Sequence, residues 1–311
     1  MQNHFNSIMP KILIAESLDT KTLNDLTKDK TDFVFDYKPD ITPVDIENAL
    51  CDYEGLIVRP KEVTGKAIRS APGLKLIVRG GAGLNSIDLE TAKECGVSVK
   101  NTPGENSIST AEFTFEMIMR LCAKREMMKA SEDARSGNPM DPEKYCGREL
   151  AGQKIAIIGM GYIGQALAKR AAAFDMNVIY HSRGKKDVPY QYFDNLHDLL
   201  KQEAEIISLH APLTSETNKF ISKQEFELMG HGTVLINCAR PQLVDHIAFG
   251  QALRSGLIES AGIDGDMDLI EPFLAEDSDN KCIITHHIAD STLQAQEKIT
   301  RAVIASVFNF F

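Results

Sequence analysis

The sequence has no tryptophan, and aromatic residues make up only 7% of its 311 residues. It contains no apolar run close to the ~20 residues that a membrane-spanning helix needs, and its start, "MQNHFNSIMP", lacks the basic and apolar segments of a signal peptide. Six cysteines are scattered without a Cys-x-x-Cys pair. This usage is typical of free thiols in a reducing cytoplasm and argues against a disulfide framework. We expect a cytoplasmic protein without a bound metal ion.

Basic residues are also few, because 34 lysines and arginines face 44 aspartates and glutamates, for a net charge of −10. Such an acidic chain is not expected to bind nucleic acid or an anionic membrane as its main partner, although a local basic pocket stays compatible with it. The hydrophobic share of 43% and the charged share of 25% are ordinary for a globular protein. The length suggests about two domains.

Short apolar runs alternate with helical periodicities along almost the whole chain. Continuous apolar runs between amphipathic helices indicate parallel sheets covered on both faces, and therefore an α/β, doubly wound fold with two sheets. We also predict one long helix over 109–130, a loop over 131–151 and an amphipathic helix over the last twenty residues. The predicted strands are 11–15, 55–58, 75–78, 97–99, 154–159, 177–181, 204–210, 233–237, 260–264 and 282–286.

Three glycines, Gly159, Gly161 and Gly164, have the spacing Gly-x-Gly-x-x-Gly after an apolar strand and at the start of a helical pattern. In this context the first glycine permits a tight turn, the second lets a pyrophosphate approach the backbone, and the third lets helix and strand pack closely. The phosphates would lie at the helix N-terminus, where free N–H groups favour anions. The alternative is an ordinary glycine-rich turn.

The next predicted strand ends in "VIYHSRGKK" (178–186), without the Asp or Glu that holds the ribose hydroxyls of NAD. Ser182 and Arg183 stand at that point, and Lys185 and Lys186 follow. A hydroxyl and a guanidinium suit a 2′-phosphate, which a carboxylate would repel. The turn therefore favours NADP over NAD, although NAD remains possible and the cations could simply be solvated.

Six blocks in order carry a resemblance to a known family: "LIVRGGAGLNSIDLETA" (76–92), "NTPGENSISTAE" (101–112), "ELAGQKIAIIGMGYIGQALAKRAAAFDMNV" (149–178), "IISLHAPLTSETNKFI" (206–221), "LINCAR" (235–240) and "ITHHIADSTLQAQ" (284–296). On these blocks the chain resembles the D-isomer-specific 2-hydroxyacid dehydrogenases, which include phosphoglycerate dehydrogenase and glyoxylate/hydroxypyruvate reductase. The resemblance implies a homodimer and a Rossmann-type dinucleotide-binding domain (103–291) inserted into a flavodoxin-like substrate domain (1–102 and 292–311).

The resemblance also implies the residues that interconvert a 2-oxo acid and a D-2-hydroxy acid. Arg240 would bind the substrate, His287 would donate the proton, and Glu271 would pair with His287, with Asp266 or Asp268 as alternative carboxylates. The dinucleotide would contact Gly159, Gly161, Tyr162, Ile163, Gly164, Ser182, Arg183, His210, Ala211, Pro212, Cys238, Ala239 and Asp264. The substrate would meet Arg59, Asn106 and the backbone N–H groups of Gly80, Gly81 and Ala82.

Four places depart from the pattern of the family, and one is the loop 135–145, which lacks the Gly-Lys-Trp that often precedes the dinucleotide domain in phosphoglycerate-specific relatives. Pro241-Gln242 follows Arg240 where relatives usually have glycine, and proline removes a backbone donor. His246 stands where an acidic residue is usual. The segment 264–271 lacks the usual Val-Phe after Asp264. These departures keep a second hypothesis open, a non-catalytic protein that senses the dinucleotide on the same fold.

Overall fold

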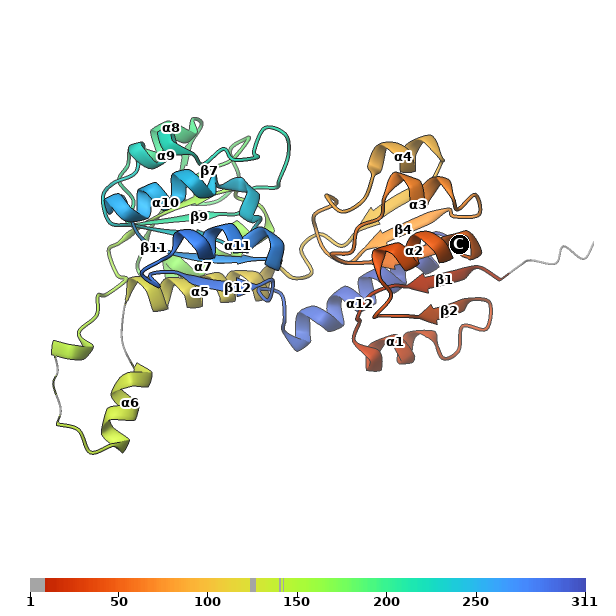
Figure 1. Ribbon diagram of the computed structural model, residues 1–311, viewed down its shortest axis with the longest axis horizontal. Helices are drawn as coiled ribbons and strands as arrows, with labels where there is room; N and C mark the ends of the chain where they lie inside the picture. Colours follow the sequence, from red (N-terminus) through yellow and green to blue (C-terminus); the bar gives the residue numbers. More distant parts are fainter. Residues whose placement is uncertain (1–8, 124–126, 140, 142) are drawn as a thin grey trace, which may run out of the picture. The chain divides into compact units, whose positions relative to one another are not determined.

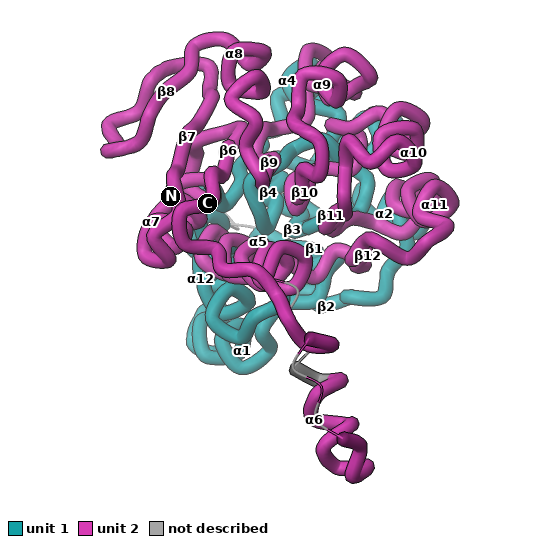
Figure 2. The backbone as a smooth tube through the Cα atoms, turned by 90° about the vertical axis from the view of Figure 1, so that its left-hand side faces the viewer, with its two compact units in different colours: residues 1–106, 291–311 teal, residues 107–290 magenta. Residues whose placement is uncertain are grey.

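The computed structural model describes residues 9–123, 127–139, 141 and 143–311. The chain divides into two compact units (Figure 2). Unit 1 comprises residues 1–106 and 291–311, and unit 2 comprises residues 107–290. Each unit is built on its own parallel sheet (Figure 1). Among the described residues, no helix combines the length and apolar character required to cross a membrane.

Unit 1 contains a five-stranded sheet in the order β2-β1-β3-β4-β5, with every neighbouring pair parallel. Its strands are β1 (Lys11–Ile14), β2 (Val34–Tyr37), β3 (Gly55–Val58), β4 (Leu76–Arg79) and β5 (Ser98–Asn101). Its helices are α1 (Thr20–Thr27), α2 (Pro43–Ala49), the short 3-10 helix η1 (Leu50–Asp52), α3 (Gly65–Arg69), α4 (Leu89–Glu94) and α12 (Leu293–Phe308).

Two apolar layers cover the sheet of unit 1. Ile12 and Ile14 of β1 pack in one cluster with Leu23 of α1 and with Ile299 and Val303 of α12. The alternate residues of the strands pack in another cluster with α2, α3 and α4. Strands β3 and β4 are buried along their whole length, as their continuous apolar runs predict. The edge strand β2 was not predicted, because its half-exposed residues form no such run.

Unit 2 contains a seven-stranded parallel sheet in the order β12-β11-β10-β9-β6-β7-β8. Its strands are β6 (Lys154–Ile158), β7 (Asn177–His181), β8 (Gln191–Phe193), β9 (Ile206–Leu209), β10 (Thr233–Asn237), β11 (Ile258–Gly265) and β12 (Ile283–His286). Its helices are α5 (Ser107–Cys122), α6 (Met127–Arg135), η2 (Glu143–Tyr145), α7 (Tyr162–Ala173), α8 (Leu196–Leu200), α9 (Lys223–Leu228), η3 (Pro241–Leu243), α10 (His246–Ser255) and α11 (Met267–Glu276).

Helices cover both faces of this sheet too (Figure 1). Helices α5 and α7 share one apolar cluster with the strands, and α8, α9, α10 and α11 share the other. The chain runs outward from β6 through β7 to β8 and then returns to β9 on the other side of β6. The strand order therefore reverses between β6 and β9. In open α/β sheets ligands bind beside such a reversal, outside the carboxyl ends of the strands.

The helix predicted over 109–130 is interrupted. Helix α5 ends at Cys122 and a separate helix, α6, begins at Met127, whereas residues 124–126 of the prediction lie outside the described residues. Helix α6 also extends into the segment that we predicted as a loop. The predicted C-terminal helix is present as α12.

Candidate functional site

Two of the three glycines after β6 are required by close backbone contacts. Gly159 has a φ of +105°, and a β-carbon there would lie 2.5 Å from the carbonyl carbon and oxygen of His210. A β-carbon on Gly164 would lie 2.1 Å from the carbonyl oxygen of Gly159. Gly161 differs, because a β-carbon there would have no neighbour within 4 Å. This open space lies at the N-terminus of α7, where Gly161 offers no side chain to cap the helix. The first N–H groups of α7 can therefore receive a phosphate.

His210 follows β9 and closes the other side of this turn. Its backbone N–H donates to Ile158 O at 2.7 Å, and its Nε2 lies 2.8 Å from Ser208 Oγ. Burial lowers the pKa of His210 to about 4. The imidazole is therefore neutral at physiological pH and cannot serve as the proton donor. Instead, the His210 backbone packs against Gly159 and limits the space in the turn.

The turn after β7 is held at both ends by tyrosine hydroxyls. Tyr180, which is fully buried, accepts the N–H of Lys186 at 2.8 Å and donates to Lys186 O at 3.3 Å. Tyr192 of the neighbouring strand donates to Ser182 O at 3.3 Å. The Ser182 hydroxyl donates to Gly184 O across the turn. Arg183 lies exposed between these anchor points. The structure thus presents this cation on a turn whose backbone is already fixed.

The strand β10 delivers Arg240 to the carboxyl edge of the sheet through a short anchored loop. Asn237, the last residue of β10, is completely buried; its Nδ2 donates to Arg240 O at 2.8 Å and its Oδ1 accepts from Ala239 N at 3.1 Å. Arg240 is extended, with φ −146° and ψ 127°, and Pro241 begins the 3-10 helix η3. Proline suits that first helical position, where its N–H would have no partner within the helix. Pro241 is thus compatible with the backbone that places Arg240.

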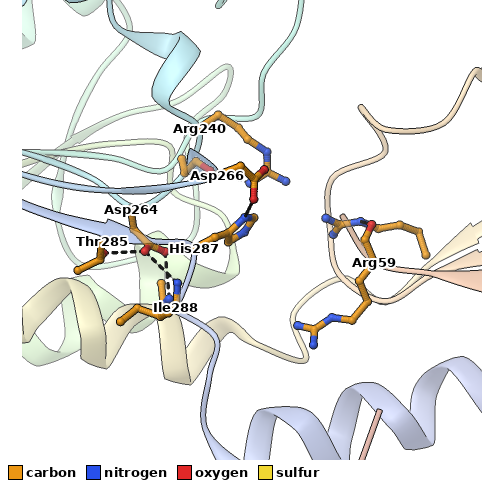
Figure 3. A network of polar contacts seen from close by, with 10 residues as sticks. Arg59, Arg240, Asp264, Asp266, Thr285, His287 and Ile288 are labelled. Carbon is orange, nitrogen blue, oxygen red and sulfur yellow. Dashed lines mark hydrogen bonds and ion pairs between the residues drawn. The ribbon is translucent and has the colours of Figure 1, made fainter. Parts of the chain in front are cut away.

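His287 is paired with Asp266, one of the two alternative carboxylates. His287 Nδ1 donates to Asp266 Oδ1 at 2.7 Å, and Figure 3 shows the Asp266 carboxylate directed at the imidazole ring with Arg240 close to it. The prediction that Glu271 makes this pair is therefore corrected: Glu271 is exposed on α11. The physical reason is that Asp266 directly follows β11, whose last residue pairs with His286 of β12. Asp268, the other alternative, is also exposed on α11.

Opposite charges surround this pair. The hydrogen bond from His287 holds the pKa of Asp266 below its ordinary value, and the nearby side chains of Arg240 and His286 act in the same direction. Burial lowers the pKa of Arg240, against the influence of Asp266 and Asp290. A guanidinium remains protonated at physiological pH under such shifts. The strand ends therefore combine a fixed cation, an ionised carboxylate and a histidine.

A second aspartate, Asp264, anchors the loop that carries His287. Its Oδ1 accepts from Thr285 Oγ1 at 2.7 Å and from Ile288 N at 2.9 Å, and its Oδ2 accepts from Ala289 N at 3.0 Å (Figure 3). His287 itself has a φ of +48°, which is uncommon without glycine and is held only where neighbouring contacts enforce it. We predicted that Asp264 contacts the dinucleotide. The structure instead shows its buried carboxylate bound to the loop.

In unit 1, two of the three predicted N–H donors are already engaged. Gly80 N donates to Val58 O at 2.8 Å, and Gly81 N donates to Thr102 Oγ1 at 2.8 Å. The predicted use of these two N–H groups for a substrate carboxylate is therefore corrected, and of the three only Ala82 keeps that role open. Glycine is required at 81 because φ is +138° and a β-carbon would lie 1.9 Å from Arg79 Nη1.

Two arginines lie at the same edge of the unit 1 sheet. Arg59 Nη1 donates to Gln296 Oε1 at 2.7 Å, and Arg79 Nε donates to Arg59 O at 3.1 Å. Lys61, two residues after Arg59, donates its ammonium to the carbonyl oxygens of Ala15 and Pro39. Its role is therefore to join loops within unit 1.

The remaining predicted residues are placed as follows. Tyr162 and Ile163 form the first turn of α7, and Ala211 and Pro212 follow His210 at the end of β9. Asn106 directly precedes α5. Ala239 accepts a hydrogen bond from the neighbouring guanidinium of Arg240. The Cys238 side chain is buried with its Sγ 3.7 Å from Met117 Sδ, and burial raises its pKa to about 12. The thiol therefore packs in the core.

Sequence reasoning missed several residues that hold the site. Asn237, Thr285, Tyr180 and Tyr192 position backbone or carboxylate groups, as described above, although the Gly-x-Gly-x-x-Gly rule does not include them. One signal was available: Asn237 ends an otherwise apolar, fully buried strand. A buried polar side chain in that place must find partners, which points to a structural hydrogen bond.

Comparison with known proteins agrees with this arrangement. Residues 117–289 match the model of the family "D-isomer specific 2-hydroxyacid dehydrogenase, NAD binding domain". Hydroxypyruvate reductase of Thermotoga maritima is 35% identical over 261 residues, which cover 81% of this chain and 83% of that protein.

Two solved structures have the same fold along nearly the whole chain. D-lactate dehydrogenase of Aquifex aeolicus, complexed with NAD and lactic acid, has a TM-score of 0.82 at 26% identity, covering 96% of this chain and 95% of that one. An acyclic imino acid reductase in complex with NADPH and D-Arg has a TM-score of 0.83 at 26% identity, covering 96% of each chain. The chain belongs to the D-isomer specific 2-hydroxyacid dehydrogenase family.

Proposed function

We propose that the protein reduces a small 2-oxo acid to the D-2-hydroxy acid with a nicotinamide dinucleotide. The observation that carries this proposal is the pair His287–Asp266, joined at 2.7 Å, at a strand end next to that of Arg240. With Nδ1 bonded to Asp266, the proton for the carbonyl oxygen would leave from Nε2. Arg240 would bind the carboxylate of the substrate and stabilise the negative charge that develops on its oxygen.

The dinucleotide would be held by two parts of unit 2. The phosphates would lie against Gly161 and the N-terminus of α7, where a β-carbon would have no neighbour within 4 Å. When bound, the nicotinamide supplies the hydride that the carbonyl carbon receives. Asp264 would keep His287 in place by holding the backbone on its C-terminal side.

We further propose that NADP is preferred over NAD. The turn after β7 carries Ser182 and the exposed Arg183 where a carboxylate would suit NAD, and both ends of this turn are hydrogen-bonded to tyrosines. The Arg183→Ala variant should raise the Kd for NADPH about tenfold, because one charge-assisted hydrogen bond to the 2′-phosphate is lost. The Kd for NADH should not change. An NADH preference that this substitution leaves unchanged would refute the assignment.

Among 2-oxo acids, we propose an unphosphorylated substrate such as glyoxylate or hydroxypyruvate. Lys61, a cation near Arg59 that could otherwise bind a phosphate, is engaged by the backbone of unit 1. A homodimer is proposed as well, because none of the described side chains of α6 is buried within the chain. Light scattering tests the dimer. The six free thiols are compatible with work in the cytoplasm.

The activity is tested by following NADPH and NADH oxidation with glyoxylate, hydroxypyruvate and phosphohydroxypyruvate. We expect turnover by the native protein and a loss of at least about 10²-fold in His287→Ala, because general acid catalysis is removed. A comparable loss is expected in Arg240→Ala. If the native protein binds a dinucleotide tightly but turns over no 2-oxo acid, the non-catalytic sensing hypothesis replaces this one.

A further inference from the structure

A contact between Pro241 and Gly265 joins the ends of two neighbouring strands in unit 2. Gly265 is the last residue of β11, and Pro241 begins η3 shortly after β10. Strands β10 and β11 pair in parallel, and both residues are buried. A β-carbon on Gly265 would lie 2.4 Å from Pro241 Cγ and 2.9 Å from Pro241 Cδ. While the proline ring occupies this place, position 265 has room for glycine alone.

The backbone of Gly265 gives no other reason for a glycine. Its φ is outside the left-handed region, unlike that of Gly159, and it lies in a regular strand paired with β12. Glycine inside a strand weakens it unless another group approaches closely. Here the ring of Pro241, whose own φ is fixed by the pyrrolidine, approaches most closely, and Ile270 Cγ2 would lie 3.2 Å from a β-carbon. The requirement at 265 therefore comes from a side chain and could change if that side chain changed.

The two residues of this contact are neighbours of the candidate catalytic groups in sequence or in strand register. Pro241 directly follows Arg240, and Gly265 directly precedes Asp266. Gly265 is also the register partner of His286, the residue before His287. A displacement of the chain at Gly265 would therefore move both members of the His287–Asp266 pair.

We propose that Pro241 and Gly265 are a matched pair of positioning residues, in which the proline ring seated on the bare α-carbon of Gly265 sets the spacing between Arg240 and the His287–Asp266 pair. The proposal rests on the reductase function proposed above. It also gives one physical cause for two departures from the family pattern, the proline after Arg240 and the missing side chain after Asp264. The ring of Pro241, after β10, fills the space that a side chain at position 265 would take at the end of β11.

A double-substitution cycle tests this proposal. Gly265→Ala should lower kcat by about tenfold or more, because the ring and the new methyl group cannot both fit and a shift of this size at reacting groups is costly. Pro241→Gly should lower kcat about fivefold, since the contact of the proline ring with Gly265 is lost while the chain still folds. In Pro241→Gly/Gly265→Ala the two closest contacts of the methyl group are gone and only Ile270 Cγ2, at 3.2 Å, has to shift slightly, so kcat should exceed that of Gly265→Ala, a non-additive result.

Two further readouts separate positioning from general loosening. The upper pH limit of reduction should fall in Gly265→Ala, because His287 loses its alignment with Asp266, and the dinucleotide Kd should stay within about twofold. In an Asp266→Asn background, Gly265→Ala should cause little further change in the upper pH limit of reduction. Gly262→Ala is the matched control on the same strand: its β-carbon would meet Met117 Sδ at 2.7 Å, Ile236 Cδ1 at 3.1 Å and Met117 Cβ at 3.2 Å, all of them side-chain atoms of the core. It should change stability and leave the pH limit unchanged.

Several results would overturn the proposal. A native kcat and pH limit in Gly265→Ala would do so, as would a double variant no better than Gly265→Ala. If Gly265→Ala does not fold, an unchanged kcat in Pro241→Gly is sufficient to reject it. Absence of turnover in the native protein is a different outcome, because it removes the reductase function first and the positioning role with it.

Discussion

Two strand ends in the sheet of unit 2 require glycine for different reasons. After β6, Gly159 and Gly164 face backbone atoms, namely those of His210 and of Gly159 itself. At the end of β11, Gly265 faces the ring of Pro241. Backbone atoms are present whatever the sequence, so the first requirement holds in every chain that makes this turn. The second holds only while position 241 carries a proline. The comparison separates a constraint of the fold from a constraint of one pair of residues.

The largest effect is expected from Gly164→Ala, which tests the backbone side of the comparison. Its β-carbon would lie 2.1 Å from Gly159 O, and no neighbouring side chain can be changed to relieve this. We expect a loss of about 3 kcal/mol in the free energy of unfolding, as for a severe case of overpacking. Urea denaturation followed by circular dichroism measures the loss.

Gly161→Ala is the matched control for this substitution. A β-carbon at 161 has no neighbour within 4 Å, and the residue has an ordinary extended backbone with φ −84° and ψ −158°. Its stability should stay within about 0.5 kcal/mol of the native value, as for an unobstructed surface position. Dinucleotide affinity should nevertheless fall, because the methyl group stands where a phosphate would approach. Equal stability of the two alanine variants would mean that the contact of position 164 with Gly159 O imposes no constraint on the turn.

The next effect concerns the carboxylate beside Gly265. Asp266→Asn should lower kcat about 10²-fold at pH 8, because His287 loses the carboxylate that its Nδ1 contacts at 2.7 Å and the proton transfer is worth at least that much. The pH above which reduction fails should also fall. Because the pKa of Asp266 is held below its ordinary value, the carboxylate stays charged down to acidic pH, and the native pair should be lost only as the pH falls through that lowered pKa.

Glu271→Gln serves as the control, since Glu271 was predicted from its place before a proline and lies exposed on α11. We expect kcat within about twofold of the native value, as for a surface substitution. Rate profiles between pH 5 and 9, a range chosen as about that over which histidine titrates, measure both variants. A large effect of Glu271→Gln together with a small effect of Asp266→Asn would mean that the carboxylate partner changes when substrate binds.

The same contrast explains what the sequence could predict. Apolar runs and helical periodicity predicted the α/β class and ten of the strands, because burial on both faces leaves a continuous apolar signal. The edge strands β2 and β8 were missed, since their residues are half-exposed and carry no such run. The glycine turn was predicted because its constraint depends on spacing alone.

The partner of His287 could not be chosen in the same way. Asp266, Asp268 and Glu271 are close together in the sequence, and the choice depends on where β11 ends and which residue of β12 lies beside it. Asp264 presented the converse problem, because the three donors that engage its carboxylate come from residues 285, 288 and 289. Such contacts are long-range in sequence, and a single sequence gives no register between distant strands.

The turn after β7 combines a backbone constraint with a side-chain constraint, because tyrosine hydroxyls hold its backbone groups. Tyr180→Phe removes the hydroxyl that binds Lys186 N and O but keeps the buried ring. Since one such hydrogen bond contributes about 1 kcal/mol, we expect a roughly fivefold higher Kd for NADPH, with NADH unaffected. Fluorescence titration with both dinucleotides measures this ratio, and Tyr190→Phe, a half-buried tyrosine on the adjoining segment, is the control. A general loosening would weaken both dinucleotides equally. A selective loss would mean that cofactor preference depends on the tyrosine that fixes the turn as well as on the arginine the turn presents.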